Sequence, residues 1–211
     1  RLIGGIIMTH GDNEGLVLPP AIAPIQVVIV PVAAHKPGVL EKAEELRARL
    51  SKFVRVKLDD SENSPGWKFA QWEMKGVPLR LEIGPKDIEN GQCVLVRRDN
   101  REKTVVALDN LVESTQQMLK DFAKAIYEKA KANLEGNITP AHNIQEMKDI
   151  LQKRVGFVKA MWCGDEHCEE VIKNETGMPS RCIPFEQEHI DDVCPVCGKP
   201  AKYMVIFGIA Y

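Results

Sequence analysis

Two short-spaced pairs of cysteines constrain the fold of this chain more than any other sequence feature. Cys163 and Cys168 are separated by four residues, Cys194 and Cys197 by two, and Gly198 directly follows the second pair. Two such pairs on separate loops predict a tetrahedral thiolate cage for Zn²⁺. Four thiolates leave no open coordination position, so we expect a structural zinc that contributes to the folding of this region.

The remaining cysteines and a neighbouring histidine leave alternatives open. Cys182 lies between the two pairs without a close partner and is interpreted as a packed thiol, whereas Cys93 begins an apolar strand and is expected in the core. His167, beside Cys168, could replace one ligand, or one pair could be ordinary buried cysteine. Five of the six cysteines lie within residues 163–197 without an export signal, which favours a metal site and a cytoplasmic protein over a disulfide framework.

The amino-acid composition limits which kinds of partner this chain can bind. The chain has 211 residues, of which 44% are hydrophobic and 27% charged, as expected for a globular protein of one or two domains. No apolar run approaches the roughly 20 residues of a membrane helix, so no membrane partner is expected. The net charge of -2 offers no overall basic surface, so nucleic acid must be bound by a local patch. The chain does not begin with Met and is expected to be a fragment.

The first two thirds of the chain alternate between strand and helix patterns. Apolar and β-branched runs predict five strands, over residues 26–32, 54–58, 79–83, 93–98 and 103–108. Helices are predicted over residues 39–53, from the N-cap pair Ser64 and Pro65 to Gly76, and over residues 109–133. The expected buried stripe of the helix over 39–53 is Leu40, Ala43, Leu46, Leu50 and Phe53. These elements predict an α/β domain with flanking helices.

A second, smaller α/β domain is expected after a polar break at residues 135–137. Thr139 and Pro140 repeat the pattern of Ser64 and Pro65 and are therefore expected to start another helix. From residue 155 onward the sequence consists of cysteines, turns and short strands, and it ends in an apolar strand over residues 203–207.

Several long motifs resemble class II prolyl-tRNA synthetases. The segment RLIGGIIMTHGDNEGLVLPP, residues 1–20, and its continuation through residue 28 are similar to the third signature motif and the passage into the anticodon domain. GWKF, Glu73, KGVPLR and EIGPKD, within residues 66–87, resemble the anticodon-binding domain. The four spaced cysteines and the terminal Tyr211 resemble the C-terminal extension of the archaeal and eukaryotic-type branch.

The resemblance implies a domain plan and an activity. Residues 1–24 would end the catalytic domain, residues 25–134 would form the anticodon-binding domain with a mixed five-stranded sheet, and residues 135–211 the zinc-binding domain. The full enzyme would be a homodimeric proline–tRNA ligase that uses ATP and Mg²⁺ to activate proline and transfers it to proline tRNA, with no role for DNA. Its first two signature motifs are absent, so this chain alone is expected to be inactive.

Two residues at the ends of the chain match active-site positions of the family. Arg1 matches the arginine that contacts ATP phosphates, a role for which a forked guanidinium is suited, although it could be an ordinary surface arginine. Tyr211 matches a terminal tyrosine whose carboxylate points toward the active site. His10 and Asp12 are interpreted as structural supports of the active-site floor and not as a catalytic acid or base.

The family reads the two guanines shared by proline anticodons with side chains that match Glu73, Arg80 and Lys86, with Arg101 or Lys103 as a looser match. A carboxylate accepts from the N–H groups on the Watson–Crick edge of guanine, whereas arginine and lysine donate to O6, N7 or phosphate.

Each of these assignments has a competing interpretation. Glu73 could lie on a solvated helix face, and Arg80 could pair only with Glu82 or Asp87. Among the aromatic residues, Trp67, Phe69 and Trp72 could stack bases, but Phe69 and Trp72 fit the core better.

Two other functions remain compatible with the fold. The chain could be a non-catalytic tRNA-binding or interaction module that reuses the anticodon-binding fold. Residues 1–20 argue against this, because such a module has no need of an ATP-site segment. It could also belong to a sister class II enzyme for histidine, threonine or glycine, against which the cysteine pairs and the set Glu73, Arg80 and Lys86 argue.

Overall fold

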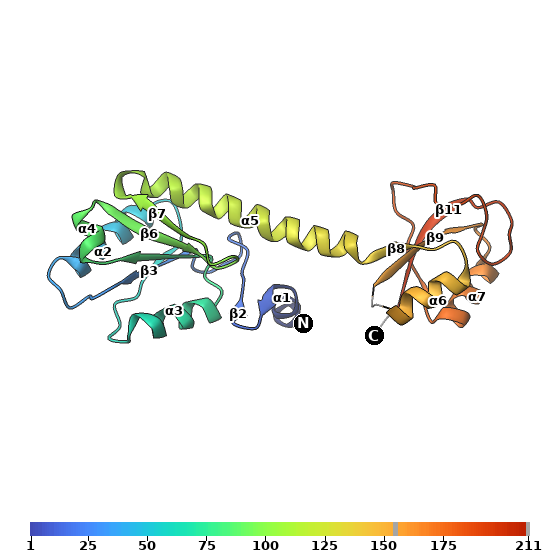
Figure 1. The fold of residues 1–211 in the computed structure, drawn as a ribbon, viewed down its shortest axis with the longest axis horizontal. Coiled ribbons are helices and arrows are strands. Elements are labelled where there is room, and N and C mark those ends of the chain that lie inside the picture. The colour runs from blue at the N-terminus through green and yellow to red at the C-terminus, as the bar shows by residue number, and fades with distance from the viewer. Residues whose placement is uncertain (154–155, 210–211) are drawn as a thin grey trace. The chain divides into compact units, whose positions relative to one another are not determined.

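The computed structural model describes residues 1–153 and 156–209. The chain divides into two compact units, Arg1–Glu128 and Lys129–Tyr211, and the long helix α5 (Leu111–Gly136) begins in the first and ends in the second (Figure 1). In the described part of the chain, no helix is both long and apolar enough to cross a bilayer. The domain boundaries predicted at residues 24 and 134 remain predictions.

The first unit contains the mixed five-stranded sheet that was predicted. Its strands are β3 (Val27–Pro31), β4 (Val56–Leu58), β5 (Leu79–Ile83), β6 (Gln92–Arg97) and β7 (Lys103–Ala107). The order across the sheet is β4-β3-β5-β6-β7. The first three strands are parallel, and β6 and β7 continue the sheet in antiparallel pairings.

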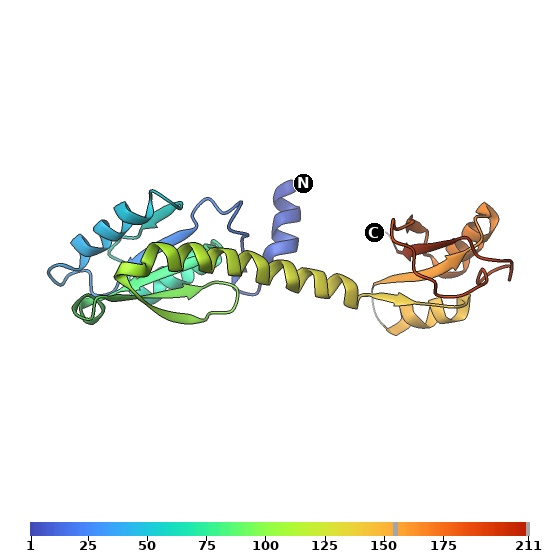
Figure 2. The same ribbon diagram turned by 90° about the horizontal axis from the view of Figure 1, so that it is seen from above.

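Helices cover the two faces of this sheet unequally. One face packs against α2 (Val39–Leu50), the short α4 (Pro85–Glu89) and the start of α5, which follows the 3-10 turn Leu108–Asn110 and crosses over the strands in Figure 2. In the described part of the chain, the helix on the opposite face is α3 (Pro65–Met74), whose Trp72 packs on Val28 and Val30. Part of that second face stays open to solvent, since Val105 of β7 is 61% exposed.

The buried stripe of α2 differs from the prediction. Leu40 is 40% exposed and Phe53 is 55% exposed. The buried residues of the helix are Val39, Ala43, Leu46 and Leu50. This stripe begins one residue earlier because Val39 is the first helical residue, and Phe53 lies beyond the last turn.

The segment before the first sheet forms a helix and a hairpin, and the hairpin packs against the end of α3. Residues 2–10 form α1 (Leu2–His10), and none of its residues is buried. The hairpin that follows pairs β1 (Gly11–Asp12) with β2 (Gly15–Leu16). A Cβ on Gly15 would lie 2.4 Å from Cα of Met74, so the hairpin and α3 meet backbone to backbone.

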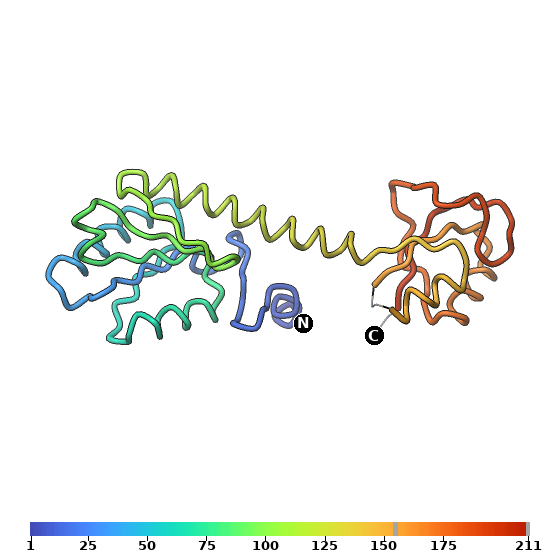
Figure 3. Tube along the Cα trace, in the orientation of Figure 1, coloured from blue at the N-terminus to red at the C-terminus, as the bar shows by residue number. Residues whose placement is uncertain are grey.

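The described part of the second unit contains the end of α5, a four-stranded sheet and two further helices. Its order is β10-β11-β9-β8, built from β8 (Ile138–Pro140), β9 (Phe157–Trp162), β10 (Ser180–Cys182) and β11 (Tyr203–Gly208). Both α6 (Ile144–Lys153) and α7 (Glu166–Thr176) contribute to its core, and the chain trace in Figure 3 follows this path. The apolar residues buried in that core are Ala141, Met147, Val158, Ala160, Ile172, Met178, Val205 and Phe207.

The helix predicted to start at Thr139 and Pro140 is wrong. Both residues lie in β8, paired in parallel with β9. The helix begins later because Asn143 supplies the cap: its Oδ1 accepts the backbone N–H of Glu146 at 2.9 Å, and the Glu146 carboxylate accepts the N–H of His142 at 2.8 Å. Asn143 therefore caps the helix one turn beyond the predicted start, and Glu146 also binds the residue before this cap.

Candidate nucleic-acid interface and metal centre

Four charged side chains form one network where the open face of the sheet meets α3. Nη1 of Arg80 donates to Oε1 of Glu73 at 2.6 Å, and Nε donates to Oε1 of Glu82 at 2.9 Å. Nζ of Lys103 lies 3.8 Å from Oε2 of the same Glu82. The two carboxylates and two cations balance in charge, which allows the network to form without a ligand.

Local structure explains why these residues meet. Arg80 and Glu82 alternate along β5 and therefore point to the same face. Lys103 lies two strands away at the start of β7, and Glu73 comes from the last turn of α3. The guanidinium of Arg80 stacks on the ring of Phe69, with Cζ 4.0 Å from the ring centroid. Stacking and ion pairs together hold Arg80 in one orientation.

This arrangement offers acceptors and donors side by side. One oxygen each of Glu73 and Glu82 makes no hydrogen bond to Arg80, and the side chain of Lys103 is 61% exposed. A base edge with N–H donors beside a carbonyl oxygen is complementary to such a pattern. Glu82 was predicted only as a partner for Arg80, although its two-residue spacing from Arg80 was a signal that it belongs on the same face.

The other predicted readers lie apart from the network. Lys86 is exposed on the short helix α4, and within the described chain it has no ion-pair partner. Arg101 forms an ion pair with Glu14 of the hairpin. The predicted ATP contact Arg1 is exposed before α1, and Tyr211 lies outside the described residues.

The three candidate stacking residues differ in exposure. Trp72 is buried, and its Nε1 donates to Oδ2 of Asp59 at 2.6 Å. Phe69 is half-buried under Arg80, whereas Trp67 is 51% exposed. The core interpretation of Trp72 is therefore correct, and only Trp67 presents a largely free ring.

A buried ion pair supports the helix that carries Glu73, and no sequence pattern pointed to it. The side chain of Lys68 is 2% exposed, and its Nζ donates to the backbone carbonyl of Asp59 at 2.9 Å and lies 3.7 Å from Oδ1. Burial works to raise the pKa of Asp59, but hydrogen bonds from Ser61 and Trp72 outweigh it and lower that pKa. The pair anchors α3 to the end of β4.

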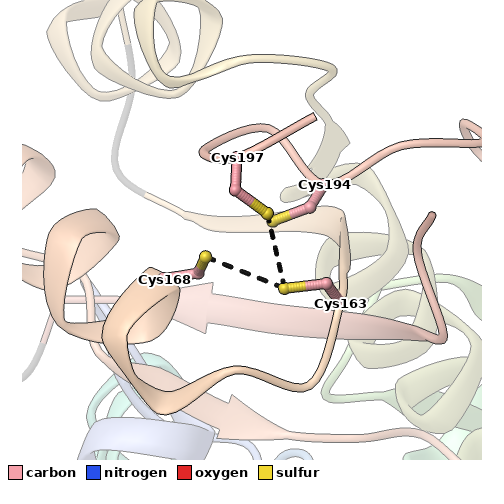
Figure 4. Close-up of side chains that lie close together, drawn as sticks. All are labelled: Cys163, Cys168, Cys194 and Cys197. Atoms are coloured by element: carbon pink, nitrogen blue, oxygen red, sulfur yellow. Dashed lines mark hydrogen bonds between the residues drawn. The ribbon is translucent and has the colours of Figure 1, made fainter. Parts of the chain in front are cut away.

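The four spaced cysteines converge in the second unit, as Figure 4 shows. Cys163 follows β9, Cys168 lies in the first turn of α7, and Cys194 and Cys197 lie on a turn closed by the N–H of Gly198 donating to Cys194 at 3.0 Å. The Sγ of Cys163 lies 3.7 Å from those of Cys168 and Cys197, and all four sulfurs lie within 4.8 Å of one another. Four sulfurs bound at about 2.3 Å to one ion would be about 3.8 Å apart, so the cluster fits a tetrahedral metal.

The thiols differ in their readiness to ionise. Burial raises the pKa of Cys168. Burial also works to raise the pKa of Cys194, but backbone N–H groups of Cys197 and Val196 outweigh it and lower that pKa to about 7. Among the described residues the cluster consists of cysteines alone, because His167 is exposed and does not join it.

The two cysteines outside the cluster differ in burial. Cys93 is fully buried, as predicted, and burial raises its pKa to about 12. Cys182 is exposed and not a packed thiol; it is the last residue of β10, the edge strand of the second sheet.

Comparisons with known proteins agree with both halves of the chain. A family model described as "Anticodon binding domain" matches residues 26–118, and one described as "Prolyl-tRNA synthetase, C-terminal" matches residues 144–211. The chain is 59% identical over 211 residues to a proline–tRNA ligase of Clostridium botulinum (strain Okra / Type B1), covering 100% of this chain and 44% of that protein.

Other relatives give the same coverage. Proline–tRNA ligase of Ruminiclostridium cellulolyticum is 58% identical and proline–tRNA ligase 2 of Bacillus cereus is 56% identical, each over 100% of this chain and 44% of the relative. The chain therefore spans less than half the length of the curated relatives that it matches. The assignment to the archaeal and eukaryotic-type branch stays a prediction.

Proposed function

Since this chain belongs to the prolyl-tRNA synthetase family, whose anticodon-binding and C-terminal domains it carries, we propose that its first unit reads the two guanines shared by proline anticodons. The observation that carries the proposal is the network of Glu73, Arg80, Glu82 and Lys103 on the open face of the sheet. Anticodon bases are single-stranded and can be splayed onto such a face.

Each group in the network has a role in this reading. Glu73 and Glu82 accept from the N1–H and N2–H₂ groups of guanine, and Arg80 and Lys103 donate to O6. Lys86, exposed at the far end of β5, contacts a second guanine or a phosphate. The exposed ring of Trp67 stacks on a neighbouring base.

The test is a titration of the 211-residue chain with proline tRNA transcript and with a transcript in which both shared anticodon guanines are replaced. The chain should bind the first transcript at least about tenfold more tightly, which corresponds to one good guanine contact. Equal affinities would remove the proposal.

Matched variants test whether guanine recognition takes place on the open face of the sheet. Arg80→Lys and Glu73→Gln should each reduce the preference for the guanine-containing transcript. The controls are Arg47→Lys and Glu44→Gln, since Arg47 and Glu44 form an ion pair on α2, which covers the opposite face of the sheet. If the control pair changes the preference as much as the network pair, the reading site lies elsewhere.

We further propose that the four-cysteine cluster holds a structural Zn²⁺. The sulfur geometry and the absence of an open coordination position support this role. Metal analysis of the purified chain should find about one zinc per chain, and replacement of Cys194 or Cys197 by serine should abolish it, whereas Cys182→Ser should not.

The whole protein is proposed to be a cytoplasmic, homodimeric proline–tRNA ligase that uses ATP and Mg²⁺. In it Arg1 would contact ATP phosphates and the carboxylate of Tyr211 would point toward the active site. A cysteine cluster suited to a metal ion is typical of a reducing compartment, which supports the cytoplasmic location. We expect the full-length protein to aminoacylate proline tRNA and this chain alone not to do so. Activity of this chain alone would contradict the proposal.

A further inference from the structure

A buried arginine outside the network fixes the end of the helix that carries Glu73. Nε of Arg98, which directly follows β6, donates to the backbone carbonyl of Glu73 at 2.9 Å. This carbonyl lies in the last turn of α3, where helix carbonyls have no partner within the helix. A guanidinium at this position satisfies the carbonyl and complements the negative end of the helix dipole.

The orientation of Arg98 depends in turn on the hairpin before the sheet. Its Nη1 and Nη2 donate to the two carboxylate oxygens of Asp12 at 2.9 and 2.7 Å. The side chain of Arg98 is only 3% exposed. A buried charge requires its partner, and a forked pair fixes both the position and the plane of the guanidinium.

Close packing reinforces this connection. Gly15 of the hairpin lies against the backbone of Met74, which is adjacent to Glu73, and a Cβ on Gly76 would lie 2.6 Å from Cβ of Leu16. Gly76 also donates its N–H to the carbonyl of Glu73 at 3.0 Å. Glu73 is therefore held at the backbone by a close packing of the hairpin, Arg98 and the end of α3.

We propose that Arg98 and Asp12 are positioning residues for Glu73, so that the β1–β2 hairpin is a structural part of the guanine-reading site. This inference rests on the proposed function. Arg98 holds the Glu73 backbone while Arg80 holds its carboxylate. The segment that resembles the third motif thus contributes to anticodon reading without contacting the RNA.

The chain provides a matched control within the same hairpin. Glu14 forms a second ion pair to the β6–β7 turn, with Arg101, but these two side chains are 49% and 56% exposed. Asp12→Asn should reduce the preference for the guanine-containing transcript about fivefold to tenfold. Glu14→Gln should leave it within about twofold, because exposed ion pairs contribute little.

Two further readouts separate positioning from general stability. Arg98→Lys, which cannot bond to Glu73 and both Asp12 oxygens together, should lose the same preference as Asp12→Asn. Hydrogen exchange of the Gly76 amide should accelerate in both variants while the sheet amides keep their protection. If circular dichroism shows that one variant fails to fold, the other variant tests the positioning role.

The outcomes distinguish this inference from the proposed function. A parent chain without preference between the transcripts overturns both. A parent chain with the preference, together with variants that keep it or weaken binding of both transcripts equally, overturns the positioning role alone.

Discussion

The two units bring polar side chains together in different ways. In the second unit, four thiols from two local turns gather into a cluster that lacks any cation of its own. In the first, carboxylates and cations from a helix and two strands neutralise one another on a preformed sheet. From this difference we expect the cysteine cluster to depend on a bound metal ion, whereas the charged network forms without a ligand.

Loss of the proposed metal ion should have the largest effect, and it tests whether the cysteine cluster depends on an ion. Chelation, or Cys194→Ser, should unfold the second unit, because a structural zinc contributes on the order of 10 kcal/mol to folding. The first unit should retain its structure, which hydrogen exchange of the β3 and β5 amides would report. Cys182→Ser is the control, and cooperative loss of both units would show that they do not fold independently.

Breaking the buried ion pair of the first unit should have the next largest effect. Lys68→Met leaves the Asp59 carboxylate buried without its cation and should lower the free energy of unfolding by about 3 kcal/mol. Urea denaturation followed through tryptophan fluorescence measures the change. Lys42→Met removes an exposed ion pair on α2 and should change it by less than about 1 kcal/mol.

Substitution within the charged network should affect recognition more than stability. Arg80→Lys retains the charge but loses the fork that joins Glu73 and Glu82. We expect a loss of about tenfold in preference for the guanine-containing transcript, since one bidentate contact contributes about 1–3 kcal/mol. Competition between the two transcripts measures this ratio, and an unchanged ratio would mean that the network is only structural.

The smallest expected effect is a pH dependence. Hydrogen bonds from Arg98 lower the pKa of Asp12 below its ordinary value of 3.8 in the folded protein. The unfolded chain binds this proton first, so the stabilisation is present above pH 3.8 and is lost as the pH falls through the folded pKa. Asp12→Asn should therefore make thermal stability less sensitive to acid between pH 5 and pH 2 (approximate limits), whereas Glu14→Gln should not.

Local patterns predicted much of this molecule. The alternation of apolar residues predicted the five strands of the first sheet, and the Ser64 cap is confirmed by its hydrogen bond with the N–H of Trp67. The cap predicted at Thr139 was wrong because pairing with β9 overrides a local preference. Local signals therefore predict an element only where tertiary pairing does not compete with them.

By itself, the sequence determined the cysteine cluster and the face shared by Arg80 and Glu82, because residue spacing and the two-residue period of a strand act locally. Only the tertiary structure decided that Arg98 meets Asp12, 86 residues away, that Lys68 is buried on Asp59 and that Cys182 is exposed. These pairings depend on how helices and hairpins pack on the sheet. Such packing leaves no periodic signal in the chain, since each contact joins different elements at a spacing that no secondary structure repeats.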